Sequence, residues 1–112
     1  MSVEHRELAA GRWSRMSFVE QMANTGSEVE RTMLWRQKGS PDYSMRAFCR
    51  ALELLDLTMA DRRNRGRLRE LARLREALAD YFCGDNRFAS SDELWRGYFL
   101  AFARAARPGG PG

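Results

Sequence analysis

Residues 61–83 read DRRNRGRLRELARLREALADYFC, a polar, arginine-rich run that leads into a leucine-rich segment. From residue 68 onward, apolar side chains recur every three or four residues, at Leu68, Leu71, Leu74, Leu78 and Phe82. This spacing puts them on one face of a helix with 3.6 residues per turn. The stretch predicts a turn over 61–66 and an amphipathic helix to about Cys83, which must bury its leucine face against other helices.

Two further helices are predicted before this stretch. Ser17 and Glu20 have the form of a capping box, in which each side chain bonds the backbone N–H of the other. The helix they start runs to about residue 38, because a glycine follows there. Ser40-Pro41 is a favoured helix opening, and the second helix runs from it to about residue 59.

A fourth helix is predicted from residue 90 to 107, opened by a possible capping box of Ser90 with Glu93 and closed by Arg107-Pro108. Short connections favour antiparallel neighbours, so we expect an all-α, up-and-down four-helix bundle. The bundle covers 17–107, residues 1–16 form an N-terminal arm or short extra helix, and 108–112 form a disordered tail. The other predicted core faces are Phe18, Met22, Val29 and Met33; Met45, Phe48, Leu52, Leu55 and Met59; and Leu94, Trp95, Tyr98, Phe99, Phe102 and Ala105.

The composition narrows the class of protein. The chain has 112 residues, 44% hydrophobic and 30% charged, as expected for one globular domain. It has no apolar run near the ~20 residues of a membrane span and no signal-peptide pattern, so we expect a cytoplasmic protein without a membrane partner. Cys49 and Cys83 lie in apolar helical patterns and are expected to be reduced core residues. His5 is the only histidine, which excludes His-based catalytic pairs and helical His metal sites within the bundle.

The arginine run carries the net charge. Residues 61–75 hold seven arginines and two acids, a charge of +5, and the remaining 12 basic and 13 acidic residues sum to −1. Four of these arginines share one arc of the predicted helix, opposite the leucines: Arg62, Arg65, Arg69 and Arg73. Such a surface suits an anionic or acidic partner. The alternative is a solvated face with local ion pairs such as Arg73 with Glu76.

Arg67 and Arg75 differ from these four because the helical projection puts them at the edges of the leucine stripe. A partly buried guanidinium needs a carboxylate. We expect a structural ion pair between helices, with Asp56 as the first candidate partner and Glu53 as the second.

The first predicted helix carries a polar stripe away from its core face, formed by Asn24, Glu28, Arg31 and Trp35. Trp and Arg are frequent anchors of protein interfaces, so this stripe is a second candidate partner-binding surface. The alternative is that Trp35 covers an adjacent helix.

An enzymatic alternative rests on carboxylates. Glu53 and Asp56 form an ExxD on a helix, with Glu28 on the preceding helix. This resembles part of the Mg²⁺ site of the all-α nucleotide pyrophosphohydrolases, which use an ExxE and a later ExxD. The resemblance implies a metal site at Glu28, Glu53 and Asp56, although Glu28 is followed at i+3 by Arg31 where that family has Glu.

The stretches NTGSEVERTMLWRQKG, RALELLDLT and RLRELARLREALADYFCGDN resemble a family of small, uncharacterised prokaryotic all-helical proteins, over about residues 17–107. More distantly, the chain resembles the HEPN domains, whose members act as ribonucleases or as partners of small nucleotidyltransferases. The ribonuclease members carry an Arg-x4-6-His motif, and this chain has no histidine after His5. The resemblance therefore implies a partner of the non-catalytic type.

Together these patterns predict a non-enzymatic helical binding module that works by protein–protein contact, with an anionic partner as one possibility. The wide apolar arc of helix 41–59 and an exposed Leu100 favour a homodimer or a protein partner. The alternatives are a Mg²⁺-dependent nucleotide hydrolase and a sequence-independent nucleic-acid binder. The binding-module hypothesis requires no cofactor and no catalytic residue.

Overall fold

The computed structural model describes residues 11–107, and within that range every regular element is helical, with no strand. The elements are α2 (Phe18–Gln37), α3 (Pro41–Ala60), the 3₁₀-helix η1 (Arg62–Arg67), α4 (Leu68–Cys83) and α5 (Asp92–Ala105). The predicted all-α class is confirmed. The predicted tail 108–112 and the first ten residues of the predicted arm lie outside the described range.

The helix ends follow local capping chemistry. Ser17 and Glu20 form the predicted capping box, each side chain bonding the other's backbone N–H at 3.1 Å. Gly39, with φ of +74°, turns the chain after α2 because a left-handed conformation costs glycine little. The predicted cap of the last helix was wrong by one residue. Ser91 caps α5 by accepting the N–H of Leu94, and Ser90 instead bonds the Asn86 side chain in the preceding loop.

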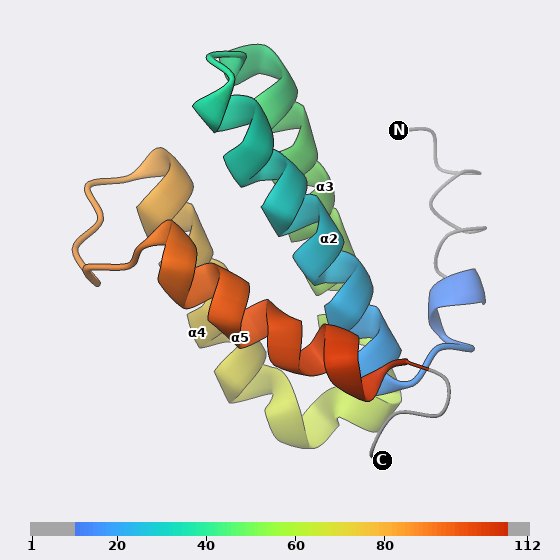
Figure 1. Cartoon of the computed structure of the whole chain (residues 1–112). Coiled ribbons are helices and arrows are strands. Elements are labelled where there is room, and N and C mark those ends of the chain that lie inside the picture. The colour runs from blue at the N-terminus through green and yellow to red at the C-terminus, as the bar shows by residue number, and fades with distance from the viewer. Residues whose placement is uncertain (1–10, 108–112) are drawn as a thin grey trace.

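The α2–α3 and α3–α4 helix pairs are antiparallel. Figure 1 shows α2 and α3 side by side as an antiparallel pair, with α5 lying along α2 at an incline. Between α3 and α4, Phe48 meets Phe82 and Asp56 meets Arg75, an order that only antiparallel helices allow. Helices α2 and α5 approach closely at Gly26, since a Cβ placed there would lie 2.7 Å from the Cβ of Phe99.

One core is shared by the four long helices. Its members are Met22, Val29, Met33, Phe48, Ala51, Leu55, Leu71, Leu74, Leu78, Trp95 and Phe99. The predicted core positions Met45, Leu68, Leu94, Tyr98 and Ala105 are wrong, because all five are exposed, the first four by at least 40%. In α3 the buried arc runs through Ser44, Ala47, Phe48 and Ala51, which leaves Met45 at its edge. Cys49 and Cys83 are free thiols and exposed, so their predicted core placement is also wrong.

A buried polar network attaches residues 11–16 to the lower end of the molecule in Figure 1. Trp13 is 6% exposed and donates its indole N–H to Oγ1 of Thr58 at 2.9 Å. The Gln21 amide donates to the Trp13 carbonyl and to Asp61, and it accepts from Asn64, each at 2.9 Å. Asn64 also donates to the Thr58 carbonyl. Buried amides of this kind are tolerated because their hydrogen bonds are made within the protein.

Candidate functional site

The seven arginines of residues 61–75 separate into two groups by their contacts. Arg63 is the first with a structural partner: its guanidinium donates to both oxygens of Asp61, at 3.1 and 2.7 Å, and to the Met16 carbonyl at 2.6 Å. The hydrogen bond from Arg63 holds the pKa of Asp61 well below its ordinary value of 3.8, and the bond from Gln21 adds to this. Arg63 therefore has a structural role, because its bonds connect residues 61–63 with Met16.

Arg75 and Arg67 have structural partners as well. Arg75 forms an ion pair with Asp56 across α4 and α3, with Nε 2.9 Å from Oδ1. The two side chains are 39% and 57% exposed, so the pair sits in solvent and is worth about 1 kcal/mol or less. Arg67 was wrongly predicted to be partly buried against a carboxylate. It is exposed, and its guanidinium lies 4.2 Å from the centre of the Phe18 ring, where the end of η1 contacts the start of α2. Glu53 is exposed and, within residues 11–107, is in no ion pair.

The four remaining arginines, Arg62, Arg65, Arg69 and Arg73, are all exposed. We call them the basic surface. Over residues 11–107 none of them forms an ion pair, and the alternative pair of Arg73 with Glu76 is not made. Five other arginines in that range do pair with carboxylates: Arg31, Arg36, Arg63, Arg75 and Arg96. Among residues 11–107, the basic surface therefore has no ion-pair partner.

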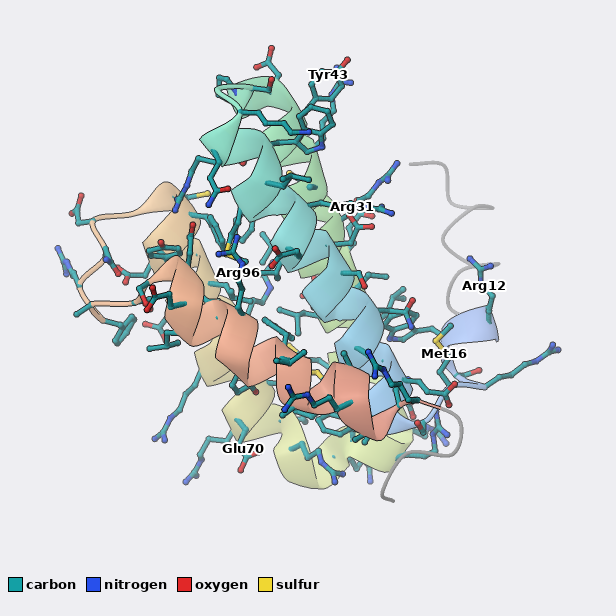
Figure 2. All side chains as sticks on the ribbon, viewed as in Figure 1. Arg12, Met16, Arg31, Tyr43, Glu70 and Arg96 are labelled. Carbon is teal, nitrogen blue, oxygen red and sulfur yellow. The ribbon has the colours of Figure 1, made fainter. Side chains whose placement is uncertain are left out.

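The basic surface spans two elements rather than one helix. Arg62 and Arg65 lie on η1, where residues three apart stack along the same side, and Arg69 and Arg73 continue at α-helical spacing on α4. Figure 2 shows Glu70, which follows Arg69, at the opposite end of the molecule from Tyr43 in the α2–α3 turn region. Glu70 is exposed and is the one acid of residues 61–75 that has no structural partner among the described residues.

The second predicted stripe is largely bonded within the chain. Asn24 donates to the Glu20 carbonyl at 2.8 Å, and Arg31 pairs with Glu28 at 2.9 Å. Figure 2 shows Arg31 on the flank of the α2–α3 pair. Trp35 stacks on Tyr43 of α3, with ring centres 4.9 Å apart. Trp35 therefore does cover the adjacent helix, and the stripe offers fewer unbonded groups than the basic surface does.

The carboxylates of the metal alternative are not brought together. Over residues 11–107, no three His, Cys, Asp or Glu side chains lie close enough to hold a metal ion. Glu28 is paired with Arg31 on α2, and Asp56 is paired with Arg75 on the side of α3 that faces α4. The predicted Mg²⁺ site at Glu28, Glu53 and Asp56 is therefore not formed by the described residues, because these side chains do not come together as a ligand set.

A clasp that the sequence did not reveal joins three helices. Arg36 of α2 donates to the Tyr81 hydroxyl of α4 at 3.0 Å and to Asp92 of α5 at 3.1 Å, and Tyr81 donates to the same Asp92 oxygen at 2.7 Å. Burial, together with the bond to Asp92, raises the pKa of Tyr81. No local pattern predicts this clasp, since its members are up to 56 residues apart.

Comparison with protein-family models, curated proteins and solved structures finds no match to this chain. Across the part of the chain that the structure describes, no helix is long and apolar enough to cross a bilayer.

Proposed function

We propose that this protein is a cytoplasmic, non-enzymatic four-helix-bundle module that binds an acidic surface of a protein partner through Arg62, Arg65, Arg69 and Arg73. The observation that carries the proposal is the division of the seven arginines of residues 61–75 into those with partners in the fold and those without an ion pair among the described residues. Three of these seven arginines contact other parts of the fold, and the other four are exposed and form no ion pair among residues 11–107.

The chemistry of these side chains supports an acidic partner. A guanidinium is always charged and offers five N–H donors in a planar fork that matches a carboxylate. Four such groups, none of them in an ion pair among residues 11–107, attract negative charge, accelerate the encounter with an acidic partner and select against basic partners. Because each arginine in solution is fully hydrated, the affinity depends on how many of them the partner desolvates and pairs at once.

Sequence-independent nucleic-acid binding is the second candidate, since phosphates would also be neutralised by this surface. The run contains no aromatic residue for base stacking, which favours a protein partner over a single strand. The same proposal includes the distant resemblance to HEPN domains. Because the chain has no Arg-x4-6-His ribonuclease motif, it would correspond to the non-catalytic partner type of that group.

The two candidates are separated by affinity capture of the tagged chain from its own host. The lysate is divided into nuclease-treated and untreated halves, and the capture is repeated with Arg69→Glu/Arg73→Glu. We expect one protein in stoichiometric amount in both halves, absent from the capture with the reversed variant.

Material that absorbs at 260 nm and disappears with nuclease would replace the acidic protein by a nucleic acid, and its affinity should then fall steeply with salt. A protein partner that the reversed variant captures as well as the wild type does would remove the basic surface from the account.

A further inference from the structure

Helix α5 is the least buried of the long helices although its sequence, DELWRGYFLAFARA, is strongly apolar. Only Trp95 and Phe99 of its 14 residues are buried. The structure describes eight large hydrophobic side chains as exposed, and half of them lie on α5 or in the loop before it, namely Phe88, Leu94, Tyr98 and Leu100. An apolar helix face in water is a candidate contact surface.

One stripe of α5 lies on the side opposite its buried residues Trp95 and Phe99, and Leu100, at the edge of this stripe, also lines the groove between α5 and α2. The stripe consists of Glu93, Gly97, Leu100 and Arg104, at spacings of four, three and four residues, and all four are exposed. A Cβ placed on Gly97 would meet no atom within 4 Å, so the backbone is open to close approach there. Glu93 and Arg104 are in no ion pair among residues 11–107.

Along this stripe, the residue types of one copy complement those of a second copy that runs in the opposite direction. The stripe reads acid, glycine, leucine, base, and a second copy running antiparallel reads base, leucine, glycine, acid. Across a two-fold axis Glu93 then faces Arg104 of the partner subunit, and Leu100 fills the space above Gly97 of the partner subunit. Both contacts occur twice, as an isologous interface requires.

We propose that the protein forms a homodimer in which α5 packs antiparallel against α5 of a second copy along this stripe. A parallel arrangement would set Glu93 against Glu93 of the partner subunit and leave the charges repelling one another. The inference does not rest on the proposed function, because the basic surface lies on η1 and α4.

A single helix pair buries less area than the ~1,200–2,000 Å² of a standard interface, so we expect a dissociation constant in the range of roughly 1–100 μM. Leu94 and Ala101, both exposed beside the stripe, widen the contact. The dimer should therefore form in concentrated solution and dissociate on dilution.

The test is sedimentation equilibrium of the full chain over a concentration series that ends near 500 μM, several times the weakest expected dissociation constant. We expect a monomer–dimer equilibrium that is weakened about tenfold or more by Leu100→Glu. Glu93→Arg and Arg104→Glu should each weaken it about tenfold, and the double reversal should restore it, because only the antiparallel register pairs these positions. Circular dichroism melts check that each variant is folded.

Gly97→Ala gives a second readout that needs no charge change. Alanine favours the helix and meets nothing in the monomer, so the melting temperature at high dilution should rise while the dimer weakens. The proposal is overturned by a wild type that stays monomeric throughout the series, by a dimer that Leu100→Glu leaves intact, or by a double reversal that fails to restore association.

Discussion

Replacing Gly26 with alanine should destabilise the protein even though alanine is the better helix former. A Cβ at Gly26 would lie 2.7 Å from Cβ and 2.9 Å from Cγ of Phe99, which is 5% exposed. These atoms form the stem of the ring, so the side chain cannot swing clear without a change of rotamer or a movement of α5. Overpacking of this kind costs about 1–3 kcal/mol.

Helix propensity acts in the opposite direction, since alanine in a helix interior is favoured over glycine by about 1 kcal/mol. The matched control is Gly97→Ala, which makes the same exchange on α5 where nothing lies within 4 Å of the new Cβ. The propensity gain is common to both variants, so their difference in free energy of unfolding isolates the clash. We expect Gly26→Ala to be less stable than Gly97→Ala by about 1–3 kcal/mol, or very roughly 4–12 °C in melting temperature.

The assay is urea denaturation followed by circular dichroism at a protein concentration below the range of dimer formation. Phe99→Ala in the Gly26→Ala background should remove the clash, so that the two changes together cost less than their sum. If Gly26→Ala and Gly97→Ala agree within about 0.5 kcal/mol, a value well below the expected cost of overpacking, α2 and α5 do not meet closely at this position.

Three further predictions concern the lower end of the molecule and the α3–α4 contact. Folding lowers the pKa of Asp61, so the contribution of its carboxylate to the free energy of unfolding is fully present above about pH 5 and is lost as the pH falls below that. The stability advantage of the wild type over Asp61→Asn should therefore shrink between about pH 5 and 2. A difference in stability that stays constant over this range would contradict the prediction. Trp13→Phe keeps the apolar ring but loses the bond to Thr58, and should lower the free energy of unfolding by about 1 kcal/mol; no change would mean that residues 11–16 are not attached by that bond. A double-mutant cycle on Asp56 and Arg75 should give a coupling of about 1 kcal/mol or less that declines with salt, and a larger, salt-independent value would place this exposed pair in a buried setting.

The helices were predictable because their signals are local. The capping box of Ser17 and Glu20, the Ser40-Pro41 opening and the leucine spacing of residues 68–82 each act within one or two turns. The up-and-down arrangement was an inference from short connections, and contacts such as Gly26 with Phe99 could not be inferred in this way. They depend on how whole helices pack, which no window of sequence contains.

The sequence predicts which arginines belong to the candidate site, but not which of them have partners within the fold. A helical projection treats residues 61–75 as one α-helix, and the change from η1 to α4 at Arg67 moves that side chain onto Phe18. The sequence does not indicate the ion pair of Arg63 with Asp61, because Asp61 lies in the predicted turn, where no helical spacing relates the two residues. Gln21 and Asn64 are buried and bonded to each other, but no hydrophobic pattern in the sequence indicates this contact.

The central claim is that the basic surface is the working surface of the protein. It is tested most directly by the affinity of the captured partner for two variants with the same change of charge and the same spacing, Arg69→Glu/Arg73→Glu and Arg46→Glu/Arg50→Glu, the second on the exposed side of α3. The account predicts a loss of at least about 100-fold for the first, as expected when hydrogen-bonded charges at an interface are reversed, and about twofold or less for the second. Equal losses would mean that only the net charge matters, and an unchanged affinity for the first variant would contradict the account.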